Sequence, residues 1–432
     1  MRRTVLILVV ALVAVTLFAA GQKDSAPTTP SVTTISMTWW GDTKRNDVYN
    51  AVIDLFETAN PGVKVERPFS TWALYFDKLS TQLAGGAAPD VIGMHQRYVS
   101  EYASRGALLD MQKFVDSGVI DITNMPKSIL NNGYIDGKLL MISQGVTGSG
   151  IGYNTGTFDK LGVPYPSMDW TYDEYVATLK ALKQAAEAKG ITIWPGTDLS
   201  FDFYNFSYWV RAKGENLFTT DGNIGFSRNT LIEWFKFNND LRNQKLICDA
   251  ATSVEYTGIP LEQSLFANNK AAIVAMPASQ LVLYQKQVTD TGKISIVRFP
   301  RFKGGPNPEY ISGAYYTINA SSKNPELAAK LINFFINDPQ GQKIFKQEQG
   351  VPPMTTGIQA IVGDLSEPER KSIDFIQNQL VANASPEPYP PAGYNEINSN
   401  YVSTATAVAF GELTPEKAAD EFLNICKQIL KK

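Results

Sequence analysis

Histidine and cysteine, on which most metal sites and many nucleophilic active sites depend, are nearly missing from this sequence. Its 432 residues include a single histidine, His95, and two cysteines. One histidine cannot supply the several ligands of a zinc site. The P-loop, the His-Glu-x-x-His motif and the nucleophile elbow of serine hydrolases are also absent. We therefore expect a protein that is not an enzyme, with no catalytic residue, no metal and no cofactor.

The two cysteines, Cys248 and Cys426, are far apart and lie in apolar helical segments. Free cysteine is among the most frequently buried residue types. We expect two buried free thiols even in an oxidising compartment, with a disulfide as the alternative.

Charge of one sign is not concentrated anywhere in the chain. There are 39 basic and 42 acidic residues, and loss of Arg2 and Arg3 with a signal peptide would leave 37 basic residues and a net charge of about −5. Nucleic acid and anionic membranes are poor partners for such a chain, because they bind through clustered lysine and arginine.

A long hydrophobic run occurs only at the N-terminus. Arg2 and Arg3 precede the apolar run 5–20, which ends in small residues. The run is short for a bilayer span of about 20 residues, which favours a cleaved signal peptide, residues 1–21, with a retained anchor as the alternative. No cysteine is placed there to carry a lipid, so we expect an exported protein, periplasmic or associated with the cell surface. Residues 22–30 are predicted to form a disordered leader.

The mature chain begins with the pattern of a β-α-β unit. Alternation predicts a strand over 33–40, apolar spacing predicts a helix over 46–59, and 63–65 opens a second strand. A helix over 75–84 and a strand over 89–92 continue the pattern, so the fold should be doubly wound α/β with parallel strands. In such sheets ligands bind beyond the carboxyl ends of the strands.

A second α/β region is expected, since a mature chain of roughly 400 residues usually forms two or more domains. Helices are predicted over 173–189 and 261–267, and strands over 271–276 and 294–299. A helix over 325–336 then resembles the pattern of the first region.

A series of short elements follows in order along the mature chain. They are Trp39-Trp40-Gly41, Asn60 to Val65, Ala84 to Val91, Gly106 to Asp110, Tyr134 to Gly137 with Tyr153-Asn154, Trp170-Thr171, and Ser312 to Tyr315 with Ser322 to Ala328. Together they resemble the extracellular solute-binding proteins of the group that includes maltose-binding protein and many oligosaccharide binders. The resemblance covers nearly the whole mature chain.

This resemblance implies a two-lobed clamshell of the type II periplasmic-binding-protein kind, which closes over its ligand by hinge motion. The chain should cross between the lobes near Ser143, Ile296 and Asp338. The N-terminal lobe would take residues 31–142 and 297–338, and the C-terminal lobe 143–296 and 339–432. The implied function is the capture of a carbohydrate for an ABC importer, with the membrane permease as partner and the protein itself a monomer.

A sugar site needs aromatic ring faces for stacking and amide or charged groups for paired hydrogen bonds. Alternation puts Trp39 and Trp40 on opposite faces of a strand, and Trp40 is the predicted cleft residue. Asp42 is either a ligand contact or the N-cap of the next helix, and Arg45 either pairs a uronate or is a solvated helix residue. Further candidates that follow predicted strands are Trp72, Tyr75, His95 and Gln96.

Other candidates come from later in the chain. They are Gln144, Asp198, Asn205, Trp209, Tyr256, Gly313 and Tyr315. Trp209 is the predicted stacking wall opposite the first lobe. Gly313 and Tyr315 resemble a glycine and an aromatic residue of the family's returning strand, where a missing side chain lets the ligand approach the backbone.

Two other functions stay open at this point. A binding protein of the same fold could take glycerol phosphate, a polyamine or a peptide, because one fold hosts many ligands. A secreted polysaccharide-active enzyme would need paired carboxylates, for which Asp42 and Asp198 are candidates. Nothing in their spacing pairs them, and the abundance of tryptophan and amide residues near strand ends favours a sugar.

Overall fold

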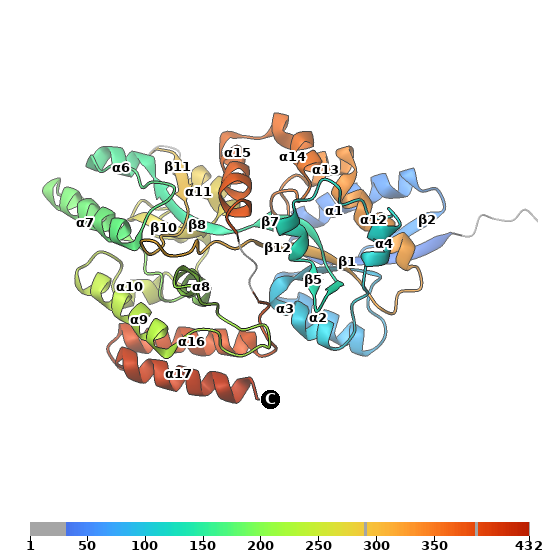
Figure 1. The fold of residues 1–432 in the computed structure, drawn as a ribbon. Helices are drawn as coiled ribbons and strands as arrows, with labels where there is room; N and C mark the ends of the chain where they lie inside the picture. The colour runs from blue at the N-terminus through green and yellow to red at the C-terminus, as the bar shows by residue number, and fades with distance from the viewer. Residues whose placement is uncertain (1–31, 289–291, 385–387, 432) are drawn as a thin grey trace, which may run out of the picture.

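The computed structural model describes residues 32–288, 292–384 and 388–431. The predicted signal peptide and leader, residues 1–30, lie outside the described residues. Within these ranges, no helix is long and apolar enough to cross a membrane. The structure has two lobes, each built on its own β-sheet (Figure 1).

The first lobe contains a mixed sheet with the strand order β2-β1-β4-β12-β7, and β3 also pairs with β1. The strands are β1 (Thr33–Trp40), β2 (Val63–Glu66), β3 (Phe69–Ser70), β4 (Val91–His95), β7 (Ile142–Thr147) and β12 (Ser312–Ile318). The expected parallel β-α-β unit is confirmed, with Thr33 opposite Val63 and Met37 opposite Val91. The returning strand β12 is antiparallel to both β4 and β7.

Helices cover both faces of this sheet and a short hairpin lies beside it. The elements are α1 (Thr43–Ala59), α2 (Trp72–Ala84), α3 (Gln96–Ser104), α4 (Gln112–Asp116), α5 (Lys127–Asn131), β5 (Tyr134–Ile135), β6 (Lys138–Leu139), α12 (Pro325–Asn337), α13 (Pro339–Phe345), α14 (Thr355–Ile361) and the 3₁₀ turn η3 (Val362–Asp364). In the hairpin, β5 and β6 are antiparallel, with Tyr134 opposite Leu139 and Ile135 opposite Lys138.

The second lobe contains a four-stranded sheet with the order β11-β8-β10-β9. Its elements are β8 (Ser149–Asn154), α6 (Thr155–Leu161), α7 (Tyr172–Ala188), β9 (Trp194–Gly196), α8 (Phe203–Ala212), α9 (Arg228–Asn243), α10 (Ala250–Glu255), η1 (Leu261–Gln263), β10 (Ala271–Pro277), η2 (Ala278–Gln280), α11 (Leu281–Gln287), β11 (Ile294–Val297), α15 (Glu367–Asp374), the π-helical turn η4 (Phe375–Val381), α16 (Tyr394–Ala409) and α17 (Pro415–Ile429). The helix predicted over 261–267 is only the 3₁₀ turn η1. Helices α16 and α17 pack on α9 at the outer side of this lobe (Figure 1).

The chain passes between the sheets at other places than expected. Strand β7 continues to Thr147, so the first crossing is at Gly148 rather than near Ser143. The second crossing occupies the segment between β11 and β12, so it begins after Val297, just beyond the position expected near Ile296. Asp338 is a helix boundary inside the first lobe, because its carboxylate caps α13 and α13 packs on α1. The third crossing follows η3, since the next helix, α15, packs on α11.

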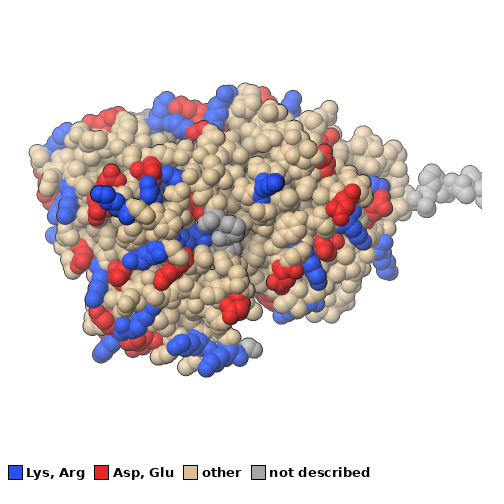
Figure 2. Space-filling view, viewed as in Figure 1, with Lys and Arg blue, Asp and Glu red and all other residues tan. Residues whose placement is uncertain are grey.

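Both cysteines are buried and free, as predicted. Burial raises the pKa of Cys248 and of Cys426 to about 12, which keeps both thiols protonated. Charges of both signs are interspersed over the face of the molecule shown in Figure 2, which agrees with the absence of basic runs in the sequence.

Candidate functional site

The cleft between the lobes contains two adjoining compartments. The larger, of about 650 Å³, has Trp40, Trp72 and Gly313 on the first-lobe side and Leu283 on the second-lobe side. The smaller, of about 340 Å³, is lined by residues of both lobes, among them Gln96, Arg97, Ser149, Asn205 and Ser279. His95 and Thr147 line both compartments. The site therefore lies beyond the carboxyl ends of β1 and β4, where the α/β pattern predicts a ligand.

An aromatic wall forms the first-lobe side of the cleft. It consists of Trp40 at the end of β1, Trp72 at the start of α2 and His95 at the end of β4. The ring centroids are 5.2 Å apart for Trp40 and Trp72 and 5.3 Å apart for Trp72 and His95, with edge-to-face geometry. Trp40 is 6% exposed and Trp72 is 40% exposed, so Trp72 presents the open ring face. Trp39, on the other face of β1, is fully buried and stacks on Tyr49, as strand alternation predicts.

His95 has a fixed tautomer and stays neutral. Its Nδ1 accepts a hydrogen bond from the backbone N–H of Arg97 at 3.2 Å, which leaves the proton on Nε2. Burial, and secondarily the positive charge of Arg97, lowers the pKa of His95 to about 3. The imidazole is therefore a hydrogen-bond donor rather than a cation at neutral pH.

Arg45 lines the larger compartment but is already paired. Its Nε donates to Glu348 Oε1 at 2.7 Å, and its Nη2 donates to the Glu348 carbonyl at 3.1 Å. Nη1 reaches the carbonyl oxygen of Trp40 at 3.4 Å. Asp42 lies outside both compartments and is exposed; its Oδ1 accepts the backbone N–H of Arg45 at 2.9 Å as the N-cap of α1. The N-cap alternative for Asp42 is thus what the structure shows.

Several predicted site residues turn out to hold the first lobe together instead. Tyr75 is 2% exposed and donates to the carbonyl oxygen of Gly93 at 2.8 Å. Gln144 is buried, where it accepts a hydrogen bond from Tyr49 at 2.7 Å and donates to the Tyr315 carbonyl at 2.7 Å. Strand alternation and position in the chain cannot distinguish these internal contacts from contacts with a ligand.

Gly313 and Tyr315 lie on β12 and differ in their relation to the cleft. Gly313 lines the larger compartment, and a Cβ there would overlap the carbonyl oxygen of Gly145 on the neighbouring strand. The close packing of β12 against β7 therefore requires this glycine whether or not a ligand is bound. Tyr315 is 3% exposed, and its hydroxyl lies 3.5 Å from Oε1 of Gln96, so it positions Gln96 rather than stacking in the open cleft.

Trp209 does not form the wall opposite Trp72. It is 4% exposed and packs in the core of the second lobe against Tyr172 and Phe302, with ring centroids 4.7 and 4.8 Å away. The aromatic spacing of the α8 sequence is explained by this core, because Trp234 and Phe237 of α9 also pack against Trp209 and cover the side on which it might otherwise have been open.

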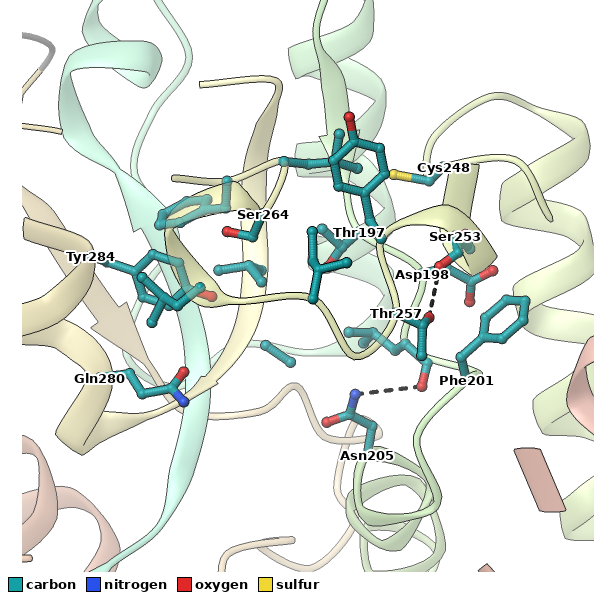
Figure 3. A pocket seen from close by; sticks show the side chains of 18 residues that line it. Thr197, Asp198, Phe201, Asn205, Cys248, Ser253, Thr257, Ser264, Gln280 and Tyr284 are labelled. Atoms are coloured by element: carbon teal, nitrogen blue, oxygen red, sulfur yellow. Dashed lines mark hydrogen bonds between the residues drawn. The ribbon is translucent and has the colours of Figure 1, made fainter. Parts of the chain in front are cut away.

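The remaining predicted residues of the second lobe lie around a separate chamber of about 310 Å³, shown in Figure 3. Asp198, Asn205 and Tyr256 line it, and Asn205 also faces the cleft. The Asp198 carboxylate forms an ion pair with Arg242 and accepts hydrogen bonds from the backbone N–H and the hydroxyl of Ser200 at 2.8 and 2.7 Å. Asp198 is thus neutralised and does not meet Asp42.

Arg97 is a cleft residue that the sequence did not single out, and it faces Tyr204, which belongs to the polar and aromatic cluster that the sequence shows after residues 191–194. The Arg97 guanidinium lies 5.7 Å from the centroid of the Tyr204 ring, so a first-lobe cation contacts a second-lobe aromatic ring across the cleft. Nearby hydroxyl and carboxylate groups, first of all Tyr394, raise the pKa of Arg97 against the effect of burial. The available signal was the position of Arg97, two residues after His95 at the same strand end. Across the described residues, no group of three or more His, Cys, Asp or Glu side chains is arranged to hold a metal ion.

The sequence matches the bacterial extracellular solute-binding protein family over residues 40–342. The chain belongs to this family. A solved extracellular solute-binding protein of family 1 from Alicyclobacillus acidocaldarius has a TM-score of 0.78 to this structure at 26% identity, with 93% of this chain and 99% of that chain covered. These findings confirm the predicted family and the predicted two-lobed fold.

Two curated relatives of this solute-binding protein come from Bacillus subtilis (strain 168). The melibiose/raffinose/stachyose-binding protein MelE is 24% identical over 352 residues, which are 79% of this chain and 78% of MelE. The galactooligosaccharide-binding protein is 22% identical over 424 residues, which are 98% of this chain and 96% of that protein.

Proposed function

We propose that this solute-binding protein captures a neutral oligosaccharide outside the cytoplasm and delivers it, as a monomer, to the membrane permease of an ABC importer. The observation that carries the proposal is the aromatic wall of Trp40, Trp72 and His95 in a cleft whose other surfaces are rich in hydroxyl and amide groups. The names of the two curated relatives support the same ligand class.

The chemistry of the cleft suits a pyranose. Sugar rings have an apolar face, which the exposed ring of Trp72 can stack against, and a rim of hydroxyl groups. The Nε2–H of neutral His95 donates toward that rim, while the amides of Gln96 and Asn205 can both donate and accept. Hydroxyl groups of Ser149 and Ser279 line the second-lobe side.

The balance of charges favours a neutral glycan over a uronate. Arg45 would have to leave Glu348 to bind a carboxylate, and Glu348 would then lose its hydrogen bonds. Over both compartments, cations and carboxylates nearly cancel; the cations are Lys44, Arg45, Arg97 and Lys346, and the carboxylates are Asp202, Glu348 and Glu369. A polyamine or a phosphate would require an excess of one sign.

The arrangement gives no support to polysaccharide cleavage. Asp42 is an exposed helix cap in the first lobe and Asp198 is ion-paired in the second, so the two carboxylates cannot flank one glycosidic bond.

A titration of the protein from residue 22 onward with neutral and uronic-acid oligosaccharides tests the proposal. A ligand at a hundred times its dissociation constant adds about 2.7 kcal/mol to the free energy of unfolding, which a thermal-shift measurement detects. We expect shifts with neutral oligosaccharides, their loss in Trp72→Ala, and their retention in Phe410→Ala, which removes another exposed aromatic ring outside both compartments. Shifts with phosphates, polyamines or peptides alone would overturn it. Loss of sugar uptake in cells without the protein tests delivery to the permease.

A further inference from the structure

The second lobe holds a side chamber of about 310 Å³ next to the cleft (Figure 3). The chamber begins at the carboxyl ends of β9 and β10, where Thr197 and Ala275 line it. The segment from Ser253 to Leu265, which joins α10 to η1 and continues beyond it, forms much of its remaining wall, and Tyr284 of α11 completes the wall.

The side chamber adjoins the cleft through shared residues. Asn205 and Ala275 line both the chamber and the smaller cleft compartment. Gln280 lines both the chamber and the larger compartment. A molecule in the cleft therefore has the chamber directly beside it, with an amide side chain at each border.

The lining of the side chamber combines polar and apolar side chains and carries no unpaired charge. Hydroxyl groups come from residues such as Thr197, Ser264 and Tyr284, and aromatic rings from Tyr256 and Phe266. Its one carboxylate, Asp198, is held by Arg242 and by Ser200. This combination of hydroxyls, amides and rings matches a neutral polyol ring, whereas an ion would find no free countercharge.

A buried hydroxyl in this wall lacks a partner. Ser253 is 9% exposed, and its Oγ has no hydrogen-bond partner among the described residues. The hydrogen bond drawn between Ser253 and Thr257 in Figure 3 uses the backbone oxygen of Ser253, which accepts from the Thr257 hydroxyl at 2.7 Å. An unsatisfied buried polar group is unfavourable, and rotation of the Ser253 side chain toward the chamber gives its Oγ a partner on a hydroxyl-bearing ligand.

The volume limits the size of the ligand. Sites for small molecules measure about 300–1,000 Å³, and the side chamber is at the lower end of that range. A single ring fits this volume, whereas a longer part of a glycan has to stay in the cleft.

We propose that the side chamber binds one terminal pyranose ring of the neutral oligosaccharide whose other rings lie in the cleft. This inference rests on the proposed function and adds to it that the protein selects glycans by an end ring that turns into the second lobe. Asn205 and Gln280 contact the ring where it enters, and Ser253 and Thr257 contact it inside.

Filling the side chamber tests the inference. Thr257→Phe places a large side chain in the chamber at an exposed position, where the fold tolerates the change. Val254→Phe is the matched control, because Val254 is an exposed residue of the same segment that does not line the chamber. Calorimetry then measures the affinity for pairs of neutral oligosaccharides that differ by one terminal ring, beginning with raffinose and stachyose.

We expect the unmodified protein to bind the larger member of a pair at least about tenfold more tightly, as two added hydrogen bonds predict. Thr257→Phe should abolish that difference without weakening the smaller member, and Val254→Phe should keep it. Ser253→Ala, which removes only the unpaired hydroxyl, should reduce the difference about fivefold without lowering the free energy of unfolding.

Three results would overturn the inference. In the first, the Thr257→Phe and Ser253→Ala variants bind both oligosaccharides of a pair with the same affinities as the unmodified protein, which would mean that the chamber holds only water. In the second, Thr257→Phe lowers the affinity for both oligosaccharides by the same factor, which would indicate a general distortion of the lobe. If the unmodified protein binds no oligosaccharide at all, the proposed function fails and the inference fails with it.

Discussion

The first lobe places tryptophan at the ends of its strands and helices, facing the cleft, whereas the second lobe buries Trp209 and Trp234 among the helices that cover its sheet. Both lobes come from one chain, have an α/β pattern and are rich in aromatic residues. The difference is in the covering layers. In the second lobe α16 and α17, from the end of the chain, pack over α9, so rings on α8 and α9 are enclosed.

An aromatic residue at a strand or helix end is open only where no later segment of the chain covers it. Trp72 at the start of α2 remains 40% exposed beside Trp40 and His95. The second lobe presents hydroxyl and amide groups to the cleft instead. One lobe thus offers ring faces and the other offers hydrogen bonds, which together match the two kinds of surface on a sugar.

The largest expected effect concerns the core of the second lobe. Trp209→Ala should lower the free energy of unfolding by about 3–5 kcal/mol, because it leaves a cavity among tightly packed rings. Chemical denaturation measures the change, and calorimetry on the remaining folded protein should give an unchanged sugar affinity. A large loss of affinity with little loss of stability would show that Trp209 faces the ligand, and the contrast between the lobes would be wrong.

The next effect is a pH dependence at Glu309, in the crossing between β11 and β12. Burial raises the pKa of Glu309 to about 7, although Arg298 and Arg211 lower it in part. The folded protein therefore keeps a proton that the unfolded chain has lost, so stability should fall as the pH rises from about 4.5 to about 7.

Denaturation at several pH values measures this slope. We expect Glu309→Gln to remove a stability difference of about 3 kcal/mol across that range, since the pKa of Glu309 is raised from 4.5 to about 7 and one pKa unit corresponds to about 1.4 kcal/mol. His95 acts in the opposite direction, because its lowered pKa makes the folded protein less stable as the pH falls below about 6.5, and it is unchanged in the variant. An equal slope in both proteins would contradict the assignment to Glu309.

Trp72→Ala should change binding more than stability. Loss of a stacking ring is expected to weaken the sugar about tenfold, or about 1.4 kcal/mol, while the midpoint of unfolding without ligand shifts little, because the ring is partly exposed. Calorimetry with Trp72→Phe as a second variant separates a need for an aromatic ring from a need for tryptophan. Unchanged affinity in Trp72→Ala would remove the aromatic wall from the binding site.

The smallest effect is expected at Asp42. Asp42→Ala should destabilise α1 by about 1 kcal/mol, because the N–H of Arg45 loses its cap. Asp42→Asn, which retains an accepting oxygen, should restore most of the loss, and sugar affinity should stay the same in both variants. A selective loss of affinity would instead support the alternative in which Asp42 contacts the ligand.

Local pattern was sufficient for much of the framework. The alternation of Thr33 to Trp40 predicted β1 and placed Trp39 inside and Trp40 toward the cleft, which is what the structure shows. The family likeness, carried by short ordered elements, predicted the two lobes. The position of His95 and Gln96 after a buried strand predicted residues that do line the cleft.

Pairings between distant residues were out of reach. Arg45 forms an ion pair with Glu348, which lies 303 positions away in the chain, and this contact balances the charge of Arg45. Gln144 is held by Tyr49 and by the backbone of Tyr315, so it belongs to the interior. Sequence spacing carries no information about such partners, because the interaction depends on atoms that folding brings within a few ångströms.

The sequence by itself determined the type of most elements, the buried face of β1 and the strand ends that border the cleft, because these depend on neighbouring residues and on backbone periodicity. Tertiary structure alone decided which aromatic rings stay open, which charges are paired and where the chain crosses between lobes. Those properties depend on which distant segment packs over a given surface, and in this protein the segments after β12 form α13 on one lobe and α16 and α17 on the other.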